Sequence, residues 1–486
     1  MKSFRELLEN TNYTTLIGNE QVEISSLTYD SRKVTAGSCF FAVPGVQCDG
    51  HNFIAAAIKA GAAAVVCERI PEGVDTSNCA VAMVEDTNAA MAQCASSFYG
   101  HPSRQLKVVG VTGTNGKTTI ATLLYDLVRA MGHKAGLIST VVYKIDEREV
   151  ESTHTTPDAI RLQQMMAEMV KCGCEYCFME CSSHAIVQHR IGGIEFTGAL
   201  FTNLTHDHLD YHKTFAEYIR AKKQLFDRLP KRAFALVNVD DRNGEVMLQN
   251  TSAKRYTLSL RRMADFKCRI IEMLTGAMLL KVDNRDVWVR LVGRFNAYNL
   301  LTVYGAALLL GFDREEVLQQ LSLLHSVSGR FEMVAAKDGT TAIIDYAHTP
   351  DALENVISTI NEVRNGNHRL IVMCGCGGNR DRSKRPEMAA IAVREADLAI
   401  FTSDNPRHEN AEDILRDMEE GVTAGSRYLK ISDRGEAIKT AVMLAEPGDI
   451  ILLAGKGHEC YQIIGDEQLP FSDKEEVTKW FENFKR

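Results

Sequence analysis

Residues 108 to 119 read VVGVTGTNGKTT, an apolar lead-in followed by three glycines, a lysine and two threonines. Glycine-rich backbone exposes N–H groups that bind phosphate oxygens, lysine supplies positive charge, and a threonine hydroxyl can ligate Mg²⁺. One position departs from the usual spacing, because Val111 stands where a glycine is expected five residues before Gly116. The stretch predicts a nucleotide phosphate site; a glycine turn followed by a surface lysine is the alternative.

Two further stretches contain residues that bind metals. HDHLDYH (206–212) is similar to the HxHxDH signature of zinc hydrolases, but its third histidine, His212, comes one residue late. Four cysteines lie between residues 172 and 181, yet CEYCFMEC reads as a strand whose alternate side chains face opposite ways, and no second spaced pair completes a zinc site. We expect buried, reduced thiols and no zinc.

The phosphate-loop residues need a strand and a helix to position them. LKVVGV (106–111) reads as a buried strand, and KTTIATLLYDLVRAMG (117–132) as an amphipathic helix that ends at Gly132. The glycines therefore lie in a strand-to-helix turn, where the helix dipole adds attraction for an anion. Motor, switch and kinase proteins share such a loop, so the loop alone names no reaction.

Composition narrows the class of protein. The 486 residues are 45% apolar and 24% charged, with a net charge of -8 and a pI near 6.0, which predicts about three globular domains and no nucleic-acid partner. No uncharged apolar run reaches 18 residues and the N-terminus lacks an apolar signal core, so we expect a cytoplasmic protein without membrane insertion. Thirteen cysteines are then expected to stay reduced.

The chain divides into three predicted α/β domains. Gly and Pro in YGHPSRQL (99–106) place one boundary after residue 102, and the change from helical to strand-rich sequence at HSVSGRFE (325–332) places another after residue 330. The prediction is a small N-terminal α/β domain (1–102), a central phosphate-loop ATPase-like mononucleotide-binding domain (103–330) and a C-terminal Rossmann-like domain (331–486).

The last domain contains four apolar runs that each end in a polar cluster: TAIIDYAHTP, RLIVMCGCGGNRDRSKRP, LAIFTSDNPRHE and DIILLAGKGHE. Ligands of open parallel sheets bind at the carboxyl ends of the strands, which is where these clusters would lie.

Ordered blocks along nearly the whole chain resemble the Mur ligase family, the ATP-dependent amino acid ligases of peptidoglycan synthesis. The blocks are GVTGTNGKTT with its shifted glycines, LTYDSRKVTAGSCFFAVPG, DGHNFIAAAIKAGA, STHTTPD, MECSSHAIVQHRI, FTNLTHDHLDYH, GRFNAYN, SGRFE, DYAHTPDAL, GCGGNRDRSKRP, SDNPRHE and AGKGHE. Folylpolyglutamate synthesis shares the phosphate loop, but the DSR block argues against that branch.

The resemblance implies a reaction and its substrates. ATP phosphorylates the carboxylate of UDP-N-acetylmuramoyl-L-alanyl-D-glutamate, and the amine of meso-diaminopimelate then attacks the acyl phosphate. L-lysine or another diamino acid is an alternative, and a phosphate-loop regulatory ATPase or a metal-dependent hydrolase are more distant ones. We expect ATP and Mg²⁺ as cofactors, small-molecule substrates as partners, a monomer, and domain closure during catalysis.

The resemblance also assigns residues. The ATP site would comprise Thr112, Gly113, Thr114, Asn115, Gly116, Lys117, Thr118, Asn296, Asn299, Arg330, Asp345 and His348, with both asparagines at adenine. Lys117, Glu180, His208 and Lys222 would be catalytic, and Thr118, Glu180, His208 and carbamylated Lys222 (N6-carboxylysine) would hold Mg²⁺. The UDP-muramoyl dipeptide would contact Ser31, Thr155, Thr156, Ser182, Gln188 and Arg190. Diaminopimelate would contact Arg380, Asp404, Asn405, Pro406, Arg407, Gly455 and Glu459.

Three of these residues have structural alternatives. Lys222 lies on the apolar stripe of EYIRAKKQLF, where an ammonium is costly; it would either react with CO₂ to give an anionic carbamate, as the resemblance implies, or extend its charge to solvent. Ser31 is equally typical of a turn or helix cap. Arg407 would pair bidentately with the second carboxylate of diaminopimelate, or else lie solvated in a loop.

Overall fold

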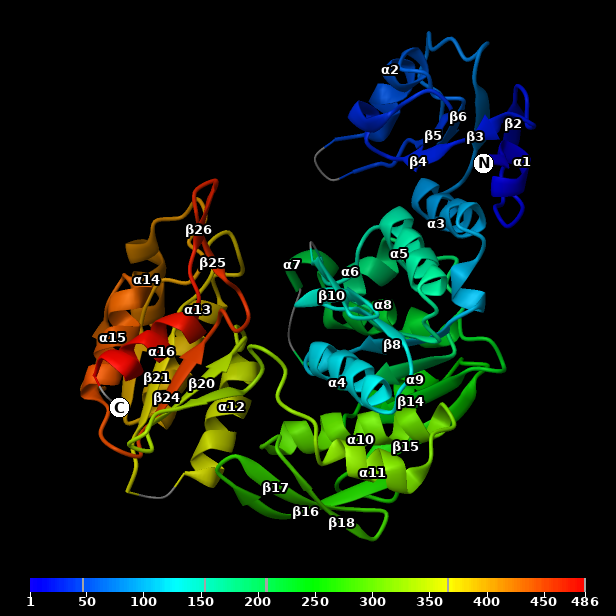
Figure 1. The fold of residues 1–486 in the computed structure, drawn as a ribbon. Helices are drawn as coiled ribbons and strands as arrows, with labels where there is room; N and C mark the ends of the chain where they lie inside the picture. The colour runs from blue at the N-terminus through cyan, green and yellow to red at the C-terminus, as the bar shows by residue number, and fades with distance from the viewer. Residues whose placement is uncertain (46–47, 153, 206–208, 365–366, 485–486) are drawn as a thin grey trace.

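The chain folds into three α/β units that follow one another in sequence, in an arc from blue to red in Figure 1. The computed structural model describes residues 1–486 except 46–47, 153, 206–208, 365–366 and 485–486. Three large sheets, each flanked by helices, confirm the predicted α/β class with three domains. The boundaries proposed after residues 102 and 330 stay predictions of the sequence.

The N-terminal sheet has the order β2-β7-β6-β5-β4, with only β2 antiparallel to its neighbour. Its strands are β2 (Thr15–Ile17), β4 (Ser26–Thr28), β5 (Ser38–Phe41), β6 (Ala64–Cys67) and β7 (Ala80–Met83), and β1 (Lys2–Ser3) pairs with β3 (Glu23–Ile24). The helices are α1 (Phe4–Leu7), α2 (Ile54–Lys59), α3 (Thr87–Phe98) and the short 3₁₀ helices η1 (Ser31–Lys33), η2 (Gly50–Phe53) and η3 (Pro102–Arg104). The helices α1 and α3 were not predicted from the sequence.

The central sheet has eleven strands in the order β11-β10-β9-β12-β8-β13-β14-β15-β16-β17-β18. The strands are β8 (Lys107–Thr112), β9 (Ala135–Ile138), β10 (Val142–Ile145), β11 (Arg148–Glu151), β12 (Tyr176–Glu180), β13 (Gly198–Phe201), β14 (Phe234–Asn238), β15 (Lys254–Ser259), β16 (Phe266–Leu274), β17 (Ala277–Val282) and β18 (Arg285–Val289). From β9 to β16 all neighbours pair in parallel, whereas the hairpins at both ends are antiparallel.

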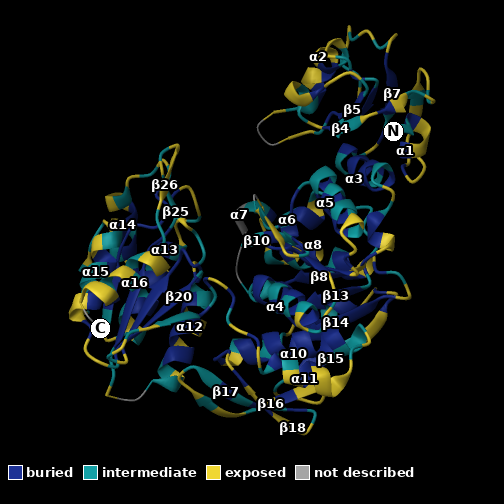
Figure 2. Ribbon diagram, viewed as in Figure 1, coloured by how far each residue is buried: buried dark blue, intermediate teal, exposed yellow. Residues whose placement is uncertain are grey.

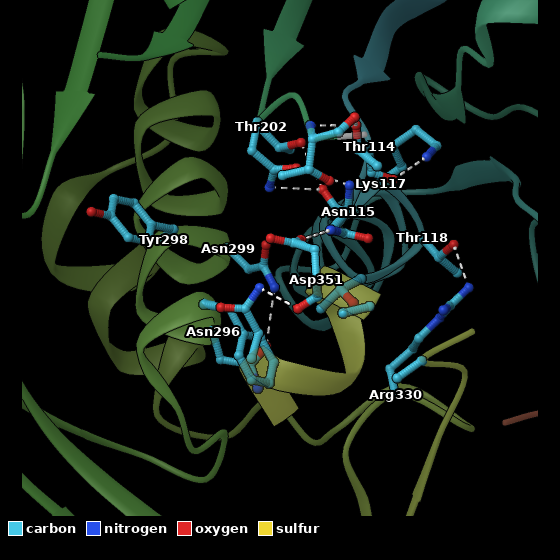
Figure 3. A pocket seen from close by; sticks show the side chains of 18 of the residues that line it. Thr114, Asn115, Lys117, Thr118, Thr202, Asn296, Tyr298, Asn299, Arg330 and Asp351 are labelled. Atoms are coloured by element: carbon cyan, nitrogen blue, oxygen red, sulfur yellow. Dashed lines mark hydrogen bonds between the residues drawn. The ribbon is translucent and has the colours of Figure 1, made fainter. Parts of the chain in front are cut away.

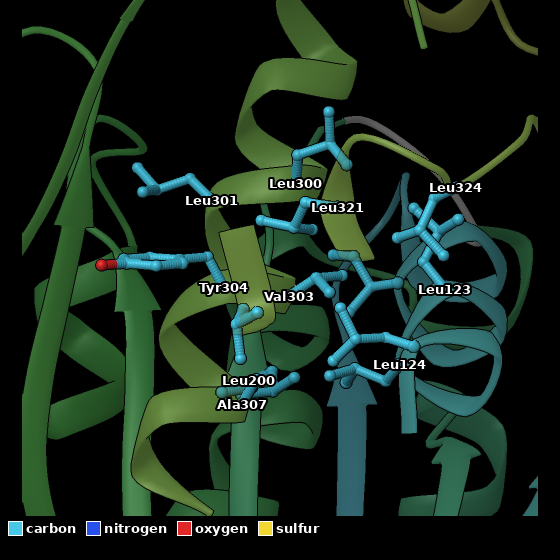
Figure 4. Packing of buried hydrophobic residues seen from close by; sticks show 14 of the residues in the cluster. Leu123, Leu124, Leu200, Leu300, Leu301, Val303, Tyr304, Ala307, Leu321 and Leu324 are labelled. Atoms are coloured by element: carbon cyan, nitrogen blue, oxygen red, sulfur yellow. The ribbon is translucent and has the colours of Figure 1, made fainter. Parts of the chain in front are cut away.

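Helices cover both faces of this sheet: α4 (Lys117–Ala130), α5 (Ala159–Lys171), α6 (Ser183–Val187), α7 (Leu209–His212), α8 (Phe215–Asp227), α9 (Gly244–Leu248), α10 (Arg294–Leu309) and α11 (Arg314–Leu321). Leucines and valines of α10 interlock with those of α4 over β13 (Figure 4). This packing holds the start of α4 against α10, so the phosphate loop and the predicted adenine side chains share one rigid support.

The C-terminal sheet has the order β19-β20-β24-β21-β22-β23, and only β19 is antiparallel to its neighbour. Its strands are β19 (Glu332–Ala335), β20 (Thr341–Asp345), β21 (Leu370–Cys374), β22 (Leu398–Phe401), β23 (Tyr428–Lys430) and β24 (Ile450–Ala454), with a separate hairpin of β25 (Tyr461–Ile464) and β26 (Glu467–Pro470). The helices are α12 (Pro350–Val363), α13 (Lys384–Glu395), α14 (Ala411–Glu419), α15 (Arg434–Leu444) and α16 (Asp473–Asn483). The four predicted strands are all present and parallel, with their polar clusters at one edge.

The inner strands of the three large sheets are buried on both faces, as the dark blue strands of Figure 2 show. Along β12, Tyr176 and Phe178 belong to one core cluster while Cys177, Met179 and the following Cys181 belong to the other. This alternation confirms that CEYCFMEC forms a strand. Among the described residues, no helix is long and apolar enough to cross a membrane.

The domains meet at two different kinds of junction. The N-terminal core cluster extends from Met91 and Ala92 of α3 to Ala159 of α5, and Ser96 Oγ donates a 2.9 Å hydrogen bond to the carbonyl oxygen of Gly193. The C-terminal domain instead packs α12 against the tip of the β16–β17 hairpin, where Thr275 Oγ1 donates to the carbonyl oxygen of Val363 at 3.4 Å. The first junction is a shared apolar core, and at the second Val292, Met273 and Phe295 of the central domain pack with the C-terminal core beside this polar contact.

Candidate active site

The phosphate loop connects the carboxyl end of β8 to the first turn of α4. Gly113 and Gly116 have φ angles of 150° and 88°. A Cβ at Gly113 would lie 1.9 Å from the Thr202 hydroxyl, and one at Gly116 would lie 2.6 Å from the amide oxygen of Asn299. Only glycine allows such close approach, so the glycine positions are dictated by β13 and α10, which press on the loop.

Lys117 opens α4 and folds back over the loop. Its Nζ donates to the carbonyl oxygens of Gly113 at 3.1 Å and Thr114 at 2.7 Å (Figure 3). Lys222, on α8, donates from its own Nζ to the same Gly113 oxygen at 2.7 Å. Two ammonium groups therefore converge on one carbonyl oxygen, which places strong positive charge at the loop.

A cavity of about 570 Å³ opens at this loop. It is lined by side chains from the central sheet, α4, α10, the segment joining the last two domains, and α12. Ten of the predicted ATP-site residues line it: Thr114, Asn115, Gly116, Lys117, Thr118, Asn296, Asn299, Arg330, Asp345 and His348. Thr112 and Gly113 are not among the lining residues, whereas Glu180, Lys222, Thr155 and Ser182 are.

The two predicted adenine residues lie one turn apart on α10. Asn296 Nδ2 donates to the carbonyl oxygen of Val292 at 2.8 Å, and Asn299 Nδ2 donates to Asn296 Oδ1 at 3.1 Å (Figure 3). These bonds fix both amides. They hold the Asn299 Oδ1 against Gly116, so this amide is in direct contact with the phosphate loop.

The segment between the central and C-terminal domains contributes charge. Arg330 Nη2 donates to the Thr118 hydroxyl at 3.2 Å, and its guanidinium lies 4.5 Å from the ring centroid of Tyr346. Asp345 Oδ2 accepts from the backbone N–H of Phe331 at 2.7 Å. Burial raises the pKa of the Asp345 carboxyl, and the Arg330 charge opposes this rise. The arginine thus connects the phosphate loop with the end of β20.

Three residues predicted for the Mg²⁺ site, Thr118, Glu180 and Lys222, line the same cavity. Glu180 is buried at the end of β12, and one carboxylate oxygen accepts from the backbone N–H of Thr140 at 2.7 Å. Lys222 is 1% exposed, which confirms the predicted apolar stripe, and its ammonium lies 4.6 Å from the ring centroid of Tyr218. His208 lies outside the described residues.

The cysteines and histidines considered for zinc occupy ordinary packed positions where they are described. Burial raises the pKa of the Cys177 and Cys181 thiols, and raises that of Cys174 to about 11, whereas Cys172 is exposed. His212 Nε2 lies 2.8 Å from the Ser183 hydroxyl. Within the described part of the chain, which excludes 206–208, no three His, Cys, Asp or Glu residues form a metal-binding group.

Most residues predicted for the dipeptide lie together. Arg190 donates to the Thr156 carbonyl oxygen at 2.9 Å and to Gln188 Oε1 at 2.6 Å, and the Thr155 hydroxyl accepts from Thr140 at 3.1 Å. Ser182 caps α6 by accepting from the N–H of Ala185. Ser31 lies apart, in η1 of the N-terminal domain.

Ser31 lies near charged residues of the central domain. Tyr29, two residues before Ser31, has a pKa that burial raises, and the charges of Asp158 and Arg190 act on it as well. This stretch of the N-terminal domain is therefore within electrostatic range of the arginine of the dipeptide group.

The predicted diaminopimelate residues form a second cluster at the carboxyl edge of the C-terminal sheet. Asn405 Nδ2 donates to Glu459 Oε2 at 2.8 Å, and Asp404 Oδ2 would lie 2.6 Å from a Cβ at Gly455. Arg407 has a φ of 52° and donates to the carbonyl oxygen of Gly378 at 2.9 Å. Pro406 is buried beside them and Arg380 is exposed. None of these seven described residues lines the 570 Å³ cavity.

Some residues of the cavity were not predicted. Asp351, at the start of α12, accepts from Asn115 Nδ2 at 3.0 Å, and its pKa is raised by burial (Figure 3). Tyr298 donates to Asp240 at 2.8 Å on the opposite wall. Asp351 follows His348 by three residues in the DYAHTPDAL block, so its place in that block could have indicated that it lines the cavity. The contact between Tyr298 and Asp240 joins segments far apart in the sequence, so no local pattern could have predicted it.

Three segments of the chain match one family in order along the sequence. Residues 23–99 match the Mur ligase family catalytic domain, 111–307 the Mur ligase middle domain, and 329–457 the Mur ligase glutamate ligase domain. The chain belongs to the Mur ligase family. Mur ligases are ATP-dependent, so this family assignment agrees with the loop and cavity described above.

Two curated relatives of this Mur ligase are named UDP-N-acetylmuramoyl-L-alanyl-D-glutamate--2,6-diaminopimelate ligase. The protein of Cytophaga hutchinsonii is 53% identical, with 97% of each chain covered, and that of Parabacteroides distasonis is 54% identical, with 98% of each chain covered. A solved structure with the same enzyme name has a TM-score of 0.71 at 33% identity, with 100% of both chains covered. The full-length coverage extends the likeness to all three domains.

Proposed function

We propose that this Mur ligase joins meso-diaminopimelate to UDP-N-acetylmuramoyl-L-alanyl-D-glutamate at the expense of ATP, as the names of its relatives describe. The observation that carries the proposal is the pairing of two sites. A phosphate-loop cavity and an amino-acid cluster with an arginine at its rim lie in consecutive domains. We further propose that the protein acts as a cytoplasmic monomer.

The first step would activate the substrate carboxylate. A carboxylate oxygen attacks the γ-phosphorus of ATP, ADP leaves, and an acyl phosphate remains. Negative charge develops on the transferred group, so fixed cations stabilise it. Lys117 and Arg330 are placed for this role, because both contact the phosphate loop or its Thr118. Asn296 and Asn299 would hold the adenine.

Mg²⁺ fits the donors that surround the loop. The Thr118 hydroxyl and the buried Glu180 carboxylate are hard oxygen ligands, which Mg²⁺ prefers, and His208 completes the proposed set. When bound, Mg²⁺ would neutralise charge on the phosphates. The chain's own contribution is to hold the two oxygen donors on β12 and α4 across one cavity.

Lys222 would join this set as a carbamate. The ammonium first loses one proton, and the neutral amine nitrogen then bonds to the carbon of CO₂ and loses a second proton, so a cation becomes an anion. In the ammonium form, Lys222 and Lys117 both donate to the Gly113 oxygen, and two like charges so close together disfavour each other. Carbamylation replaces that repulsion with attraction. The alternative of a lysine extended to solvent is disfavoured by its 1% exposure.

In the second step, the amine of diaminopimelate attacks the acyl carbon, phosphate leaves, and an amide forms. Arg407 would hold the distal carboxylate and Glu459 an ammonium, with Asp404, Asn405, Pro406, Gly455 and Arg380 completing the site. Thr155, Thr156, Ser182, Gln188 and Arg190 would hold the dipeptide, and Ser31 the uridine end. Because the amino-acid cluster does not line the ATP cavity, the reaction requires the C-terminal domain to close.

Phosphate release tests the proposal directly. The full chain is mixed with ATP, Mg²⁺ and the UDP-dipeptide, and meso-diaminopimelate, L-lysine or no amino acid is added. We expect sustained release only with meso-diaminopimelate. Equal release without an amino acid would indicate a regulatory ATPase, and equal kcat/KM with L-lysine would contradict the assigned substrate.

A further inference from the structure

Lys456 lies in the AGKGHE loop that follows β24, between Gly455 and Glu459 of the amino-acid cluster. It is 0% exposed, which is rare for a lysine. Its Nζ lies 3.0 Å from Glu459 Oε2 and 3.3 Å from Asn405 Oδ1. The ring centroid of Tyr461 is 5.7 Å from the same nitrogen. A buried ammonium is stable only with such partners.

The partners of Lys456 also bond to each other. Asn405 Nδ2 donates to Glu459 Oε2 at 2.8 Å, which closes a triangle of three side chains. Asn405 Oδ1 accepts a second bond, from the backbone N–H of Ile463 at 2.9 Å. With two donors on its oxygen, the Asn405 amide has one orientation, in which its NH₂ group faces Glu459.

The triangle joins loops of strands that are not neighbours. Asn405 follows β22 and Glu459 follows β24, and β21 lies between these two strands in the sheet. Asn405 already bridges the two loops through Glu459 and Ile463. Lys456 reinforces that bridge, because a single ammonium contacts a side chain from each loop.

The bonds fall on one side of the Glu459 carboxylate. Lys456 Nζ and Asn405 Nδ2 both bond to Oε2, and neither bonds to Oε1. The Glu459 side chain is mostly buried, and its second oxygen remains for another cation. An amino-acid ammonium group is such a cation.

We propose that Lys456 is a positioning residue for the amino-acid substrate: it fixes Asn405 and Glu459 so that Glu459 Oε1 meets the substrate ammonium. This role rests on the proposed function, since it requires the amino acid to bind at this cluster. Lys456 does not contact the ATP cavity, so its effect is confined to the amino acid.

Steady-state kinetics of the full-length Lys456→Met variant test this role. We expect KM for meso-diaminopimelate to rise about 10- to 100-fold, the usual effect of losing a hydrogen bond to a charged group. KM values for ATP and for the UDP-dipeptide should stay within about twofold. Equal rises in all three KM values, or an unchanged KM for meso-diaminopimelate, would overturn the proposal.

Lys479→Met is the matched control. Lys479 also pairs with a glutamate three residues away, at the same 3.0 Å, but it is exposed on α16. Its kinetics should match the wild type. If Lys456→Met does not fold, Lys456→Arg is tested instead. Arginine keeps the positive charge but moves the hydrogen-bond donors, so KM for meso-diaminopimelate alone should rise severalfold. If KM for meso-diaminopimelate does not rise selectively, the proposed role is overturned.

A double variant separates positioning from direct contact. If Lys456 acts through Glu459, the variant Lys456→Met/Glu459→Gln should have the same KM for meso-diaminopimelate as Glu459→Gln alone. If the two substitutions multiply each other's effect on KM for meso-diaminopimelate, Lys456 does not act through Glu459. A wild-type enzyme that releases no phosphate with meso-diaminopimelate would instead refute the proposed function.

Discussion

Gly113 is the point at which the two lysines of the phosphate site meet. Lys117 comes from the next turn of the chain and Lys222 from a helix more than a hundred residues later, yet both donate to the same carbonyl oxygen. The first contact follows from the local motif. The second depends on how α8 packs, and it gives Lys222 access to both the loop and the cavity.

Lys222→Ala should lower kcat by about 100-fold or more, because it removes a charged group next to the transferred phosphate. Short carboxylic acids such as acetate should restore part of the activity if the active form is a carbamate, since they supply an anion in the space that the side chain leaves.

The neighbouring variant Lys223→Ala is the control. Lys223 is on the same helix and pairs with Asp227, away from the cavity lining. It should retain wild-type kcat and show no response to acetate. Full activity of Lys222→Ala, or activation of both variants by acetate, would show that no anion is needed at this position.

Arg407→Ala should remove the preference for meso-diaminopimelate over L-lysine. A guanidinium left unpaired opposite lysine costs roughly 2 to 5 kcal/mol, so the wild-type ratio of kcat/KM values should be about thirty or higher and should fall towards one in the variant. Arg416→Ala, an exposed arginine on α14, should leave the ratio unchanged. A ratio that survives in Arg407→Ala would assign selectivity to other residues.

At the scale of single elements, α12 connects the C-terminal domain to the phosphate loop. Its cap is Thr349, which is 2% exposed and accepts from the N–H of Ala352, and Pro350 occupies the first turn. Asp351, in the same turn, accepts from Asn115 of the loop. The start of this helix therefore sets the position of one wall of the ATP cavity.

Thr349→Ala should lower the free energy of unfolding by about 1 kcal/mol and raise KM for ATP, because the loosened first turn carries Asp351. The cap of α15, Asp433, accepts from Glu436 in the same way but lies away from the cavity lining. Asp433→Ala should show a similar loss in urea denaturation with an unchanged KM for ATP. Identical KM effects in both variants would mean that general destabilisation is responsible.

Elements with strong local patterns were predictable. β8, α4, α10 and the four C-terminal strands each have a continuous apolar run or clear periodicity, and all are present. α3 was missed because TNAAMAQCASSF is rich in small residues and has a weak apolar stripe. No strand was predicted for β16 to β18, whose stability comes from pairing at the end of the sheet.

Only the site residues that belong to recognisable sequence motifs could be predicted. Ten ATP-site residues assigned by resemblance line one cavity, although their roles remain proposals. Tyr298, Asp240 and Lys456 were not predicted, because each acquires its partner through folding rather than through nearby sequence. Charged side chains buried by distant elements have no signature in a linear pattern.

At the scale of the whole molecule, the two junctions predict which parts move. The N-terminal and central domains share a core through α3 and α5, whereas the C-terminal domain meets the phosphate loop through the polar contact of Asp351 and packs its core on a few apolar residues of the central domain, among them Val292. We expect closure to bring the C-terminal domain towards a rigid pair formed by the other two (Figure 1).

Distance measurements between attached spin labels test this expectation. One label is placed near α12 in the C-terminal domain and the other in the central domain. With an ATP analogue and the UDP-dipeptide bound, the distance between these two labels should shorten by several ångströms, a usual range for hinge closure. Distances between the N-terminal and central domains should stay within about 1 Å. A large change in the second set would refute the rigid pair.

The helix α3 also affects how the protein forms during synthesis. One of its faces packs on the N-terminal sheet, and Met91 and Ala92 share a cluster with α5, which ends about seventy residues later in the chain. At 5 to 20 residues per second, a ribosome needs about 4 to 15 seconds to make that stretch. During this time one face of α3 in the nascent chain is uncovered. The N-terminal domain therefore completes its core only after α5 has been made. Chaperones that bind exposed apolar segments can bind α3 in that interval.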